Sequence, residues 1–196
     1  MADDRYEIRL SGSGGQGIIL ASIILAEAAS IFEGYQVSQT QSYGPQARGG
    51  RCKAEVVISK KQIDYPKAMQ LDMMLAMNQA SCDAYCYDFK HNGLLIIDSS
   101  LVDQVPTSRV VALPFTHIAN ELTGKNLVAN IVGLGTLGYL CPLISQESLE
   151  KALAARVPKG TKGINRKALL AGIKAAKEID LDALPRSATP EEEEEI

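Results

Sequence analysis

The residues best suited to binding chemistry form a glycine-rich run near the start of the chain, Gly12-Ser13-Gly14-Gly15-Gln16-Gly17. The run follows a short apolar stretch, residues 6–10, and leads into a longer apolar stretch that starts at Ile18. A strand, a glycine turn and a helix in this order are typical of a Rossmann-like unit, in which backbone N–H groups and the helix N-terminus attract a pyrophosphate. We therefore predict that the turn binds phosphate or another anion; a tight turn without a ligand is the alternative. The amide of Gln16 either donates to a ligand or a neighbouring subunit, or caps its own loop.

The segment after the second apolar stretch argues against a nicotinamide dinucleotide. In such sites an Asp or Glu about 20 residues beyond the glycine motif binds the ribose hydroxyls. Here residues 35–37 lead into Ser38-Gln39-Thr40-Gln41-Ser42, which contains no carboxylate. The sequence thus predicts the fold of a dinucleotide-binding unit without its usual ligand.

A second glycine-rich loop follows directly after the segment that lacks this carboxylate. Its sequence is Tyr43-Gly44-Pro45-Gln46-Ala47-Arg48-Gly49-Gly50-Arg51. Its glycines permit unusual backbone angles. Arg48 and Arg51 supply planar cationic groups that suit a phosphate, a carboxylate or the acidic groups of a partner. We predict a binding or interface role for this loop; the alternative is an exposed connection with solvated arginines.

Other residues with reactive side chains form no recognisable site. The cysteines, Cys52, Cys82, Cys86 and Cys141, include no Cys-x-x-Cys pair, and we interpret them as small buried thiols rather than as zinc or cluster ligands. The basic run 159–163 suits the phosphates of a nucleotide-bearing thiol, but a solvated loop is the favoured interpretation. We recognise no nucleophile–base pair, metal cluster or carboxylate dyad, and predict no catalytic residue and no metal site.

A further GxGxxG match, residues 133–138, lies within the uncharged stretch 126–146 and follows no strand. We interpret these glycines as positions where another helix approaches closely. The stretch has about the length of a membrane span, but its asparagines, glycines and Pro142 favour a packed helix. We recognise no secretory signal at the N-terminus, and expect a cytoplasmic protein without a membrane segment.

Length and composition indicate one α/β domain. The chain has 196 residues, of which 46% are hydrophobic, and a net charge of −3. The run Glu191-Glu192-Glu193-Glu194-Glu195 accounts for the negative sign, so the rest is close to neutral and predicts no nucleic-acid binding. We expect a single domain over residues 1–180 and a disordered acidic tail over residues 181–196.

Hydrophobic period and turn residues predict the elements that position these loops. Expected strands cover residues 6–10, 36–39, 52–59, 71–77, 94–97 and 110–113, and expected helices cover residues 16–31, 79–89, 115–122, 129–140, 145–155 and 165–178. Residues 52–59 and 62–64 are expected to form an antiparallel hairpin at one edge. Asn78 and Asp98 are expected to cap the segments that follow them. The predicted fold is a Rossmann-like, mostly parallel sheet flanked by helices, with an antiparallel edge hairpin and a helical C-terminal part.

Taken together, these motifs resemble the gamma subunits of 2-oxoacid:ferredoxin oxidoreductases over roughly residues 5–178. The two glycine-rich loops carry most of the similarity, and Ala76-Met77-Asn78-Gln79-Ala80, the segment 93–101 and the segment 126–138 add to it. The form of the second loop is most similar to the 2-oxoglutarate branch; pyruvate and branched-chain branches stay open. Other open interpretations are an independent NAD(P)- or flavin-dependent enzyme, an adenylating enzyme, and a nucleotide-fold module without a ligand.

The resemblance implies a division of labour within a cytoplasmic complex that decarboxylates a 2-oxoacid oxidatively, forms an acyl-CoA and reduces ferredoxin. Thiamine diphosphate and Mg²⁺ are expected on alpha and beta subunits, and iron–sulfur clusters on beta or on a ferredoxin-like delta subunit. The gamma subunit is expected to dock on these partners, to self-associate directly or through the complex, to bind coenzyme A and to be inactive alone. The implied coenzyme A site residues are Gly12, Gly14, Gly15, Gln16, Gly17, Tyr43, Gly44, Arg48 and Gly49.

Overall fold

A computed structural model describes residues 5–44 and 49–185 of the chain. In chain order the elements are β1 (Arg5–Ser13), α1 (Ile18–Glu27), the π-helical turn η1 (Ala28–Phe32), β2 (Gln36–Tyr43), β3 (Arg51–Ser59), β4 (Leu71–Ala76), α2 (Gln79–Tyr85), β5 (Phe89–Asp98), β6 (Val110–Leu113), α3 (Phe115–Thr123), α4 (Ala129–Leu140), α5 (Gln146–Arg156), the 3₁₀ turn η2 (Lys159–Thr161) and α6 (Lys162–Ala176). Within the strand-containing part only α1, η1 and α2 interrupt the succession of strands, and helices alone follow β6 among the described residues, as the sequence pattern predicts.

The strands form one mixed sheet of six strands in the order β2-β3-β1-β4-β5-β6. Strands β1, β4, β5 and β6 are mutually parallel, and β3 runs antiparallel to both of its neighbours, β2 and β1. The predicted fold class, a mostly parallel sheet with an antiparallel edge, is therefore confirmed.

The partner strand in the edge hairpin was predicted wrongly. β3 pairs with β2, from Gln36 opposite Ser59 to Tyr43 opposite Cys52, and residues 62–64 form no strand. Side chains of β1 hold the connection after β3 instead. The guanidinium of Arg5 donates to the carbonyl of Tyr65, and the Glu7 carboxylate accepts from the backbone N–H of Gln70 at 2.8 Å. Because β3 is already paired with β1 on one side and with β2 on the other, a strand at residues 62–64 could not join it as a hairpin partner.

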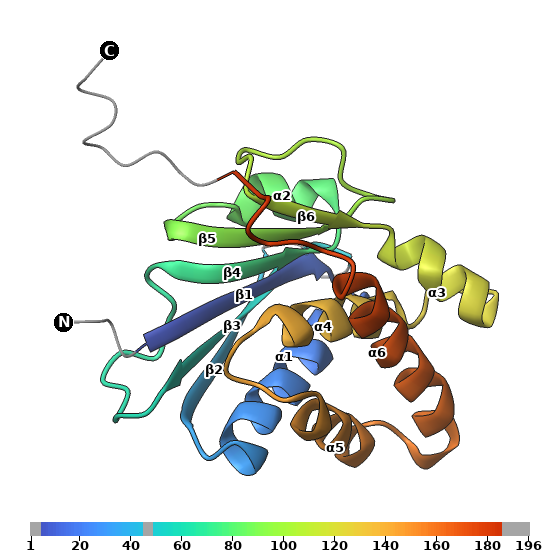
Figure 1. The fold of residues 1–196 in the computed structure, drawn as a ribbon, viewed down its shortest axis with the longest axis horizontal. Coiled ribbons are helices and arrows are strands. Elements are labelled where there is room, and N and C mark those ends of the chain that lie inside the picture. The colour runs from blue at the N-terminus through green and yellow to red at the C-terminus, as the bar shows by residue number, and fades with distance from the viewer. Residues whose placement is uncertain (1–4, 45–48, 186–196) are drawn as a thin grey trace.

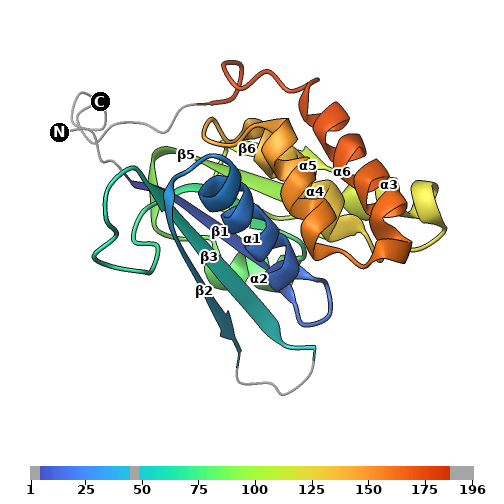
Figure 2. The same cartoon turned by 90° about the horizontal axis from the view of Figure 1, so that it is seen from below.

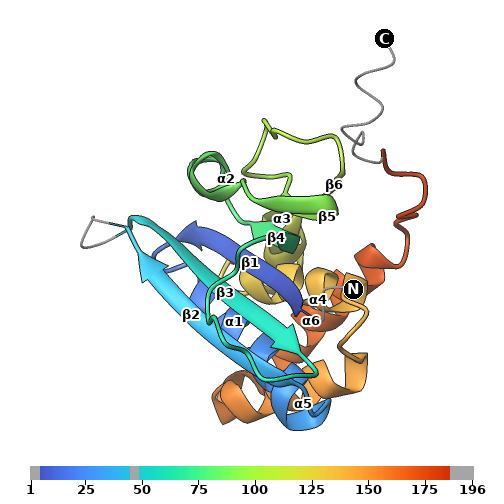
Figure 3. The same ribbon diagram turned by 90° about the vertical axis from the view of Figure 1, so that its left-hand side faces the viewer.

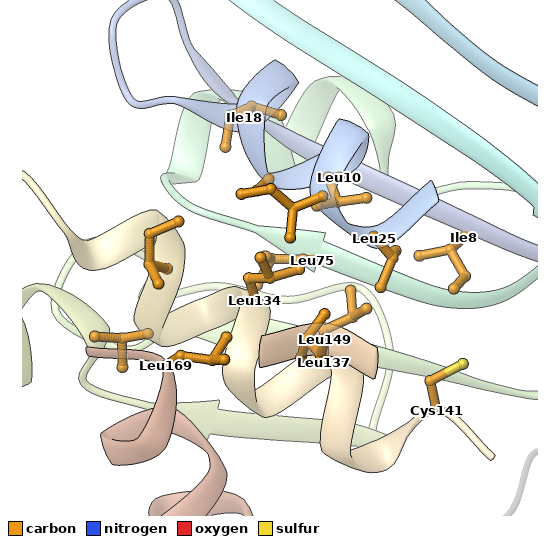
Figure 4. Close-up of a cluster of buried hydrophobic side chains, with 14 of the residues drawn as sticks. Ile8, Leu10, Ile18, Leu25, Leu75, Leu134, Leu137, Cys141, Leu149 and Leu169 are labelled. Atoms are coloured by element: carbon orange, nitrogen blue, oxygen red, sulfur yellow. The ribbon is translucent and has the colours of Figure 1, made fainter. Parts of the chain in front are cut away.

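The two faces of the sheet are covered very differently (Figures 1 and 3). Helices α1, α4, α5 and α6 lie on one face, and α2 lies on the other. Successive side chains of a strand point to opposite faces of the sheet, so Ala54, Val56 and Ile58 of β3 all point to the same face. They point to the face that the helices cover, and there they are fully buried in the main core. Figure 4 shows this core, in which Leu10 of β1, Leu75 of β4 and Leu134 of α4 meet the apolar side of α1.

Helices α4 and α6 pack with their backbones almost in contact. A Cβ atom added to Gly135 would lie 2.2 Å from the carbonyl oxygen of Leu169, and one added to Gly172 would lie 1.9 Å from that of Val132. The hydroxyl of Thr136 donates to the Gly172 carbonyl across the same contact at 3.0 Å. The interpretation of the second GxGxxG match as a helix-packing surface is confirmed.

Helix α2 is shorter and strand β5 longer than predicted. The helix stops at Tyr85 instead of residue 89, and β5 starts at Phe89 instead of residue 94. Asp88 adopts a left-handed conformation, with φ of 63°, and its carbonyl accepts from the N–H of Leu71 at 2.6 Å. This contact turns the chain onto the sheet edge of β4 and ends the helix early.

The C-terminal part of the described chain packs against the body. Leu181 and Leu184, which we expected to belong to the tail, are partly buried against the main core. The Arg109 guanidinium donates to the carbonyls of both residues. The rest of the expected tail, residues 186–196, lies outside the described residues. Among the described helices none is both long and apolar enough to cross a membrane.

Candidate functional site

The two glycine-rich loops lie at the same edge of the sheet. Strands β1, β2, β4, β5 and β6 all end at this edge, which is where open α/β sheets bind ligands. In Figure 2 the turn before α1 and the described ends of the β2–β3 hairpin are at the same end of the molecule. The position of the predicted site within the fold is thus the one that α/β architecture favours.

A direct hydrogen bond joins the two loops. The N–H of Gly14 donates to the carbonyl of Gly50 at 2.8 Å, and a Cβ atom on Gly14 would lie 3.5 Å from the nitrogen of Gly49. The N–H of Gly44 in turn donates to the carbonyl of Arg51 at 2.7 Å, which closes the base of the second loop. The structure therefore brings the two predicted segments together, although Arg48 and residues 45–47 lie outside the described residues.

The first loop needs glycine at the positions that form the turn. Gly15 and Gly17 have φ angles of 97° and 73°, which L side chains rarely adopt. The N–H groups of these two residues donate to no acceptor among the described residues, and Gly17 is also the N-cap of α1. Gly12, in contrast, belongs to β1 and pairs with Cys52, so it supports the turn rather than forming it. The turn thus presents backbone donors at a helix N-terminus, the arrangement that favours an anion.

The side chain of Gln16 is used within the protein. Its Oε1 accepts from the N–H of Ser13 and from Nδ2 of Asn78, each at 2.7 Å. Its Nε2 donates to the carbonyl of Met77 at 3.4 Å. Of the two interpretations left open by the sequence, this geometry favours the cap of its own loop.

Two asparagines that the sequence analysis did not place in the site hold the first loop from either side. Asn78 caps α2 as predicted, by accepting from the N–H of Ser81 at 2.9 Å, and its Nδ2 also donates to Oγ of Ser13 at 2.9 Å. Asn130 of α4 is buried, and its Nδ2 donates to the carbonyl of Gly17 at 3.1 Å. The capping pattern revealed one half of the role of Asn78. No local pattern could reveal Asn130, because its contact spans more than half of the chain.

Two other features predicted from the sequence have structural roles. Asp98 is fully buried and accepts from the N–H groups of Ser100 and Thr116 at 3.0 and 3.1 Å, which confirms it as a cap. All four cysteines are free thiols, three of them buried, in agreement with the interpretation as structural thiols; Cys86 is half-buried. Burial raises the pKa of Cys141 to about 12, so this thiol stays protonated at neutral pH.

An open α/β sheet with a glycine turn at its carboxyl edge defines the class of Rossmann-like binding modules. A family model described as "Pyruvate ferredoxin/flavodoxin oxidoreductase" matches residues 7–175, and the chain belongs to this family. The resemblance to gamma subunits is confirmed by relatives and solved structures.

Among curated relatives, the 2-oxoglutarate synthase subunit KorC of Methanocaldococcus jannaschii is 48% identical over 179 residues, which cover 89% of this chain and 96% of the relative. The subunit of the same name from Methanothermobacter thermautotrophicus is 41% identical, covering 88% of this chain and 95% of the relative. These subunits therefore match the present chain over nearly their full length.

Two solved structures have similar folds. The gamma subunit of a keto/oxoacid ferredoxin oxidoreductase from Geobacter sulfurreducens PCA is 45% identical, with a TM-score of 0.79, and the match covers 89% of this chain and 99% of that subunit. A 2-oxoglutarate:ferredoxin oxidoreductase from Magnetococcus marinus, solved with 2-oxoglutarate, coenzyme A and succinyl-CoA bound, is 25% identical, also with a TM-score of 0.79. The second match covers 96% of this chain but 34% of the Magnetococcus chain, so the present fold corresponds to one part of that longer polypeptide.

Proposed function

We propose that this chain is the gamma subunit of a cytoplasmic 2-oxoglutarate:ferredoxin oxidoreductase and that it contributes the binding of coenzyme A. The KorC relatives support 2-oxoglutarate as the 2-oxoacid. The Magnetococcus marinus structure shows that an enzyme containing this fold binds coenzyme A. The alpha and beta subunits, and a delta subunit where one is present, are the proposed partners, with ferredoxin as the electron acceptor of the complex.

The observation that carries the coenzyme A proposal is the hydrogen bond between Gly14 and Gly50. This hydrogen bond places the first loop next to the second. The first loop has N–H groups with no acceptor among the described residues, and the second loop contains Arg48 and Arg51. Coenzyme A is a polyanion with a pyrophosphate, for which oriented amides and guanidinium groups are complementary ligands. In this proposal Gly15, Gly17 and α1 bind the pyrophosphate, and the second loop binds further phosphate oxygens. This arrangement would orient the thiol without taking part in a bond change.

The redox and carbanion chemistry of the reaction is proposed to reside on partner subunits. Thiamine diphosphate, Mg²⁺ and iron–sulfur clusters, which the family resemblance implies, need carboxylate or thiolate ligand sets. The described residues include no group of three or more His, Cys, Asp or Glu side chains that could hold a metal ion. We therefore propose that partner subunits hold these groups, and we assign to this chain only the binding of the co-substrate.

The proposal is tested by comparing the activity of the complex with and without this subunit. We expect reduction of a viologen dye by 2-oxoglutarate and coenzyme A to require the chain together with its partner subunits. The isolated chain should show no activity. Full activity of a complex that lacks the chain would contradict the proposed role.

Arg48→Ala should weaken the use of coenzyme A or the assembly of the complex, and leave the isolated fold intact. A charge-assisted contact to a desolvated phosphate is worth about 1.5–3 kcal/mol, so the KM for coenzyme A should rise at least about tenfold. Lys167→Ala, which removes an exposed cation on α6, is the control and should leave KM unchanged. Wild-type kinetics together with an unchanged mass of the complex would contradict a role for Arg48.

Asn78→Asp separates loop positioning from helix capping. Aspartate still accepts from the N–H of Ser81, but it cannot donate to Ser13 or Gln16 and places a negative charge beside the first loop. We expect α2 to remain folded by circular dichroism while the KM for coenzyme A rises about tenfold. Asn120→Asp, the same change at an exposed position of α3, is the matched control. Equal KM values for the two variants would show that Asn78 acts only as a cap.

A further inference from the structure

The face of the sheet that carries only α2 contains a charged trough over β1, β2 and β3. One cavity of 330 Å³ in this trough is lined by Arg9, Lys53, Glu55, Tyr65, Lys67, Ala68, Met69, Tyr87 and Asp88. A second cavity of 200 Å³ is lined by Thr40, Gln41, Ser42, Lys53, Glu55 and Lys67. Because the two cavities share Lys53, Glu55 and Lys67, we treat them as one feature, called the charged trough below.

Arg9 forms the floor of the charged trough and is 1% exposed. Its guanidinium donates to Glu55 Oε1 at 2.9 Å and to the carbonyls of Tyr85 and Tyr87 at 2.9 and 3.2 Å. The ring of Tyr87 lies over the guanidinium carbon at 4.5 Å. An arginine with its donors satisfied and a ring stacked on it is held rigidly, so the floor is preformed.

Glu55 is shared between two cations. Its Oε1 accepts from Arg9 and also from the ammonium of Lys53 at 2.8 Å. Asp88 is the other carboxylate of the trough, and its Oδ2 is 4.0 Å from the Arg9 guanidinium. The lining thus holds three cations, Arg9, Lys53 and Lys67, against two carboxylates.

The rim of the charged trough is apolar and open. Tyr65, Tyr87 and Met69 are 49%, 45% and 61% exposed. Lys67 is exposed beside them, and its ammonium forms no ion pair with any described residue. Tyrosine, methionine and arginine are the residue types enriched at the centres of protein interfaces.

We propose that the charged trough is the docking site for an acidic segment of a partner subunit of the oxidoreductase. This inference rests on the proposed function, because it requires that the chain works within a complex. A partner Asp or Glu pairs with Lys67 and Lys53, and an apolar side chain next to it packs on Tyr65, Met69 and Tyr87. Charge complementarity selects an acidic partner, since the unpaired charge at the rim is positive.

Carbodiimide cross-linking of the purified complex tests the proposal directly, because this reagent joins an amine to a carboxylate only where the two are in contact. We expect peptide mapping by mass spectrometry to find Lys67 linked to an Asp or Glu of another subunit. Links from Lys67 only to carboxylates of its own chain or of a second copy, or no link from Lys67, would overturn the proposal.

Lys67→Glu provides a second, independent readout. We expect at least a tenfold increase in the dissociation constant of this chain from its partner subunits, and a weaker dependence of that constant on salt. Lys167→Glu makes the same charge change on α6 and should leave the constant unchanged. Equal dissociation constants for the two variants would overturn docking at the trough. The coenzyme A-dependent activity of the reassembled complexes, measured in parallel, tests the proposed function separately.

Discussion

Gly172→Ala should destabilise the protein by about 3 kcal/mol or more, and it is expected to be one of the most damaging single-methyl additions to the described chain. The added Cβ would lie 1.9 Å from the carbonyl oxygen of Val132, a backbone atom that cannot rotate away. Relief therefore requires α4 and α6 to separate, which costs packing and the hydrogen bond from Thr136. The free energy of unfolding, measured by urea titration followed by circular dichroism, checks this expectation.

Gly163→Ala is the matched control in the same helix. A Cβ atom at Gly163 meets nothing within 4 Å, so alanine should stabilise α6 by roughly 0.5–1 kcal/mol through its higher helix propensity. Opposite signs for the two variants would identify close helix approach, and not propensity, as the reason for glycine at position 172. A Gly172→Ala variant as stable as wild type would contradict the observed packing of α4 on α6.

Glu55→Gln should destabilise the protein by about 3 kcal/mol, because it removes the close, buried anionic partner of the Arg9 guanidinium and leaves only the more exposed Asp88 at 4.0 Å. The loss should be visible in urea titrations at neutral pH. Glu147→Gln removes an exposed ion pair with Lys151 on α5 and should change the free energy of unfolding little. Similar effects of the two substitutions would contradict a buried charge network beneath the trough.

Glu55→Gln should also change how the free energy of unfolding depends on pH. Burial favours the neutral form of Glu55, but the hydrogen bond from Lys53 and the charge of Arg9 outweigh it and hold the pKa of this carboxyl below its ordinary value of 4.5. Its charged form therefore stabilises the folded state fully above pH 4.5, and this contribution is lost as the pH falls through the lowered pKa. Between neutral and acidic pH the unfolding free energy of Glu55→Gln should decline less steeply than that of the wild type.

Local sequence signals predicted the glycine turn, the parallel strands and most helices, because each depends on residues that are close along the chain. The turn before α1 is an example, since Gly15 and Gly17 meet a local backbone requirement. The edge hairpin and the end of α2 could not be predicted in this way. Both depend on pairings that no local pattern specifies: β3 lies between β1 and β2, and the N–H of Leu71 donates to the carbonyl of Asp88 beyond the end of α2.

The second face of the sheet also depends on residues that are distant in the sequence. Glu55 alternates along β3 with the residues of the main core, and on the opposite face of the sheet it is only 4% exposed. Arg9 and the connection between β3 and β4 cover it, and both come from other parts of the sequence. For the candidate site, the sequence predicted which loops converge, whereas the support by Asn130 required the tertiary structure.

The hydrogen bond from Asn130 to Gly17 joins residues that are 113 positions apart. A nascent chain that has exposed only its first hundred residues lacks this contact, so the carbonyl of Gly17 gains its side-chain partner only after α4 has docked. The binding turn near the N-terminus is thereby supported by a helix that is synthesised well after it, and a fragment that ends before α4 would lack this support.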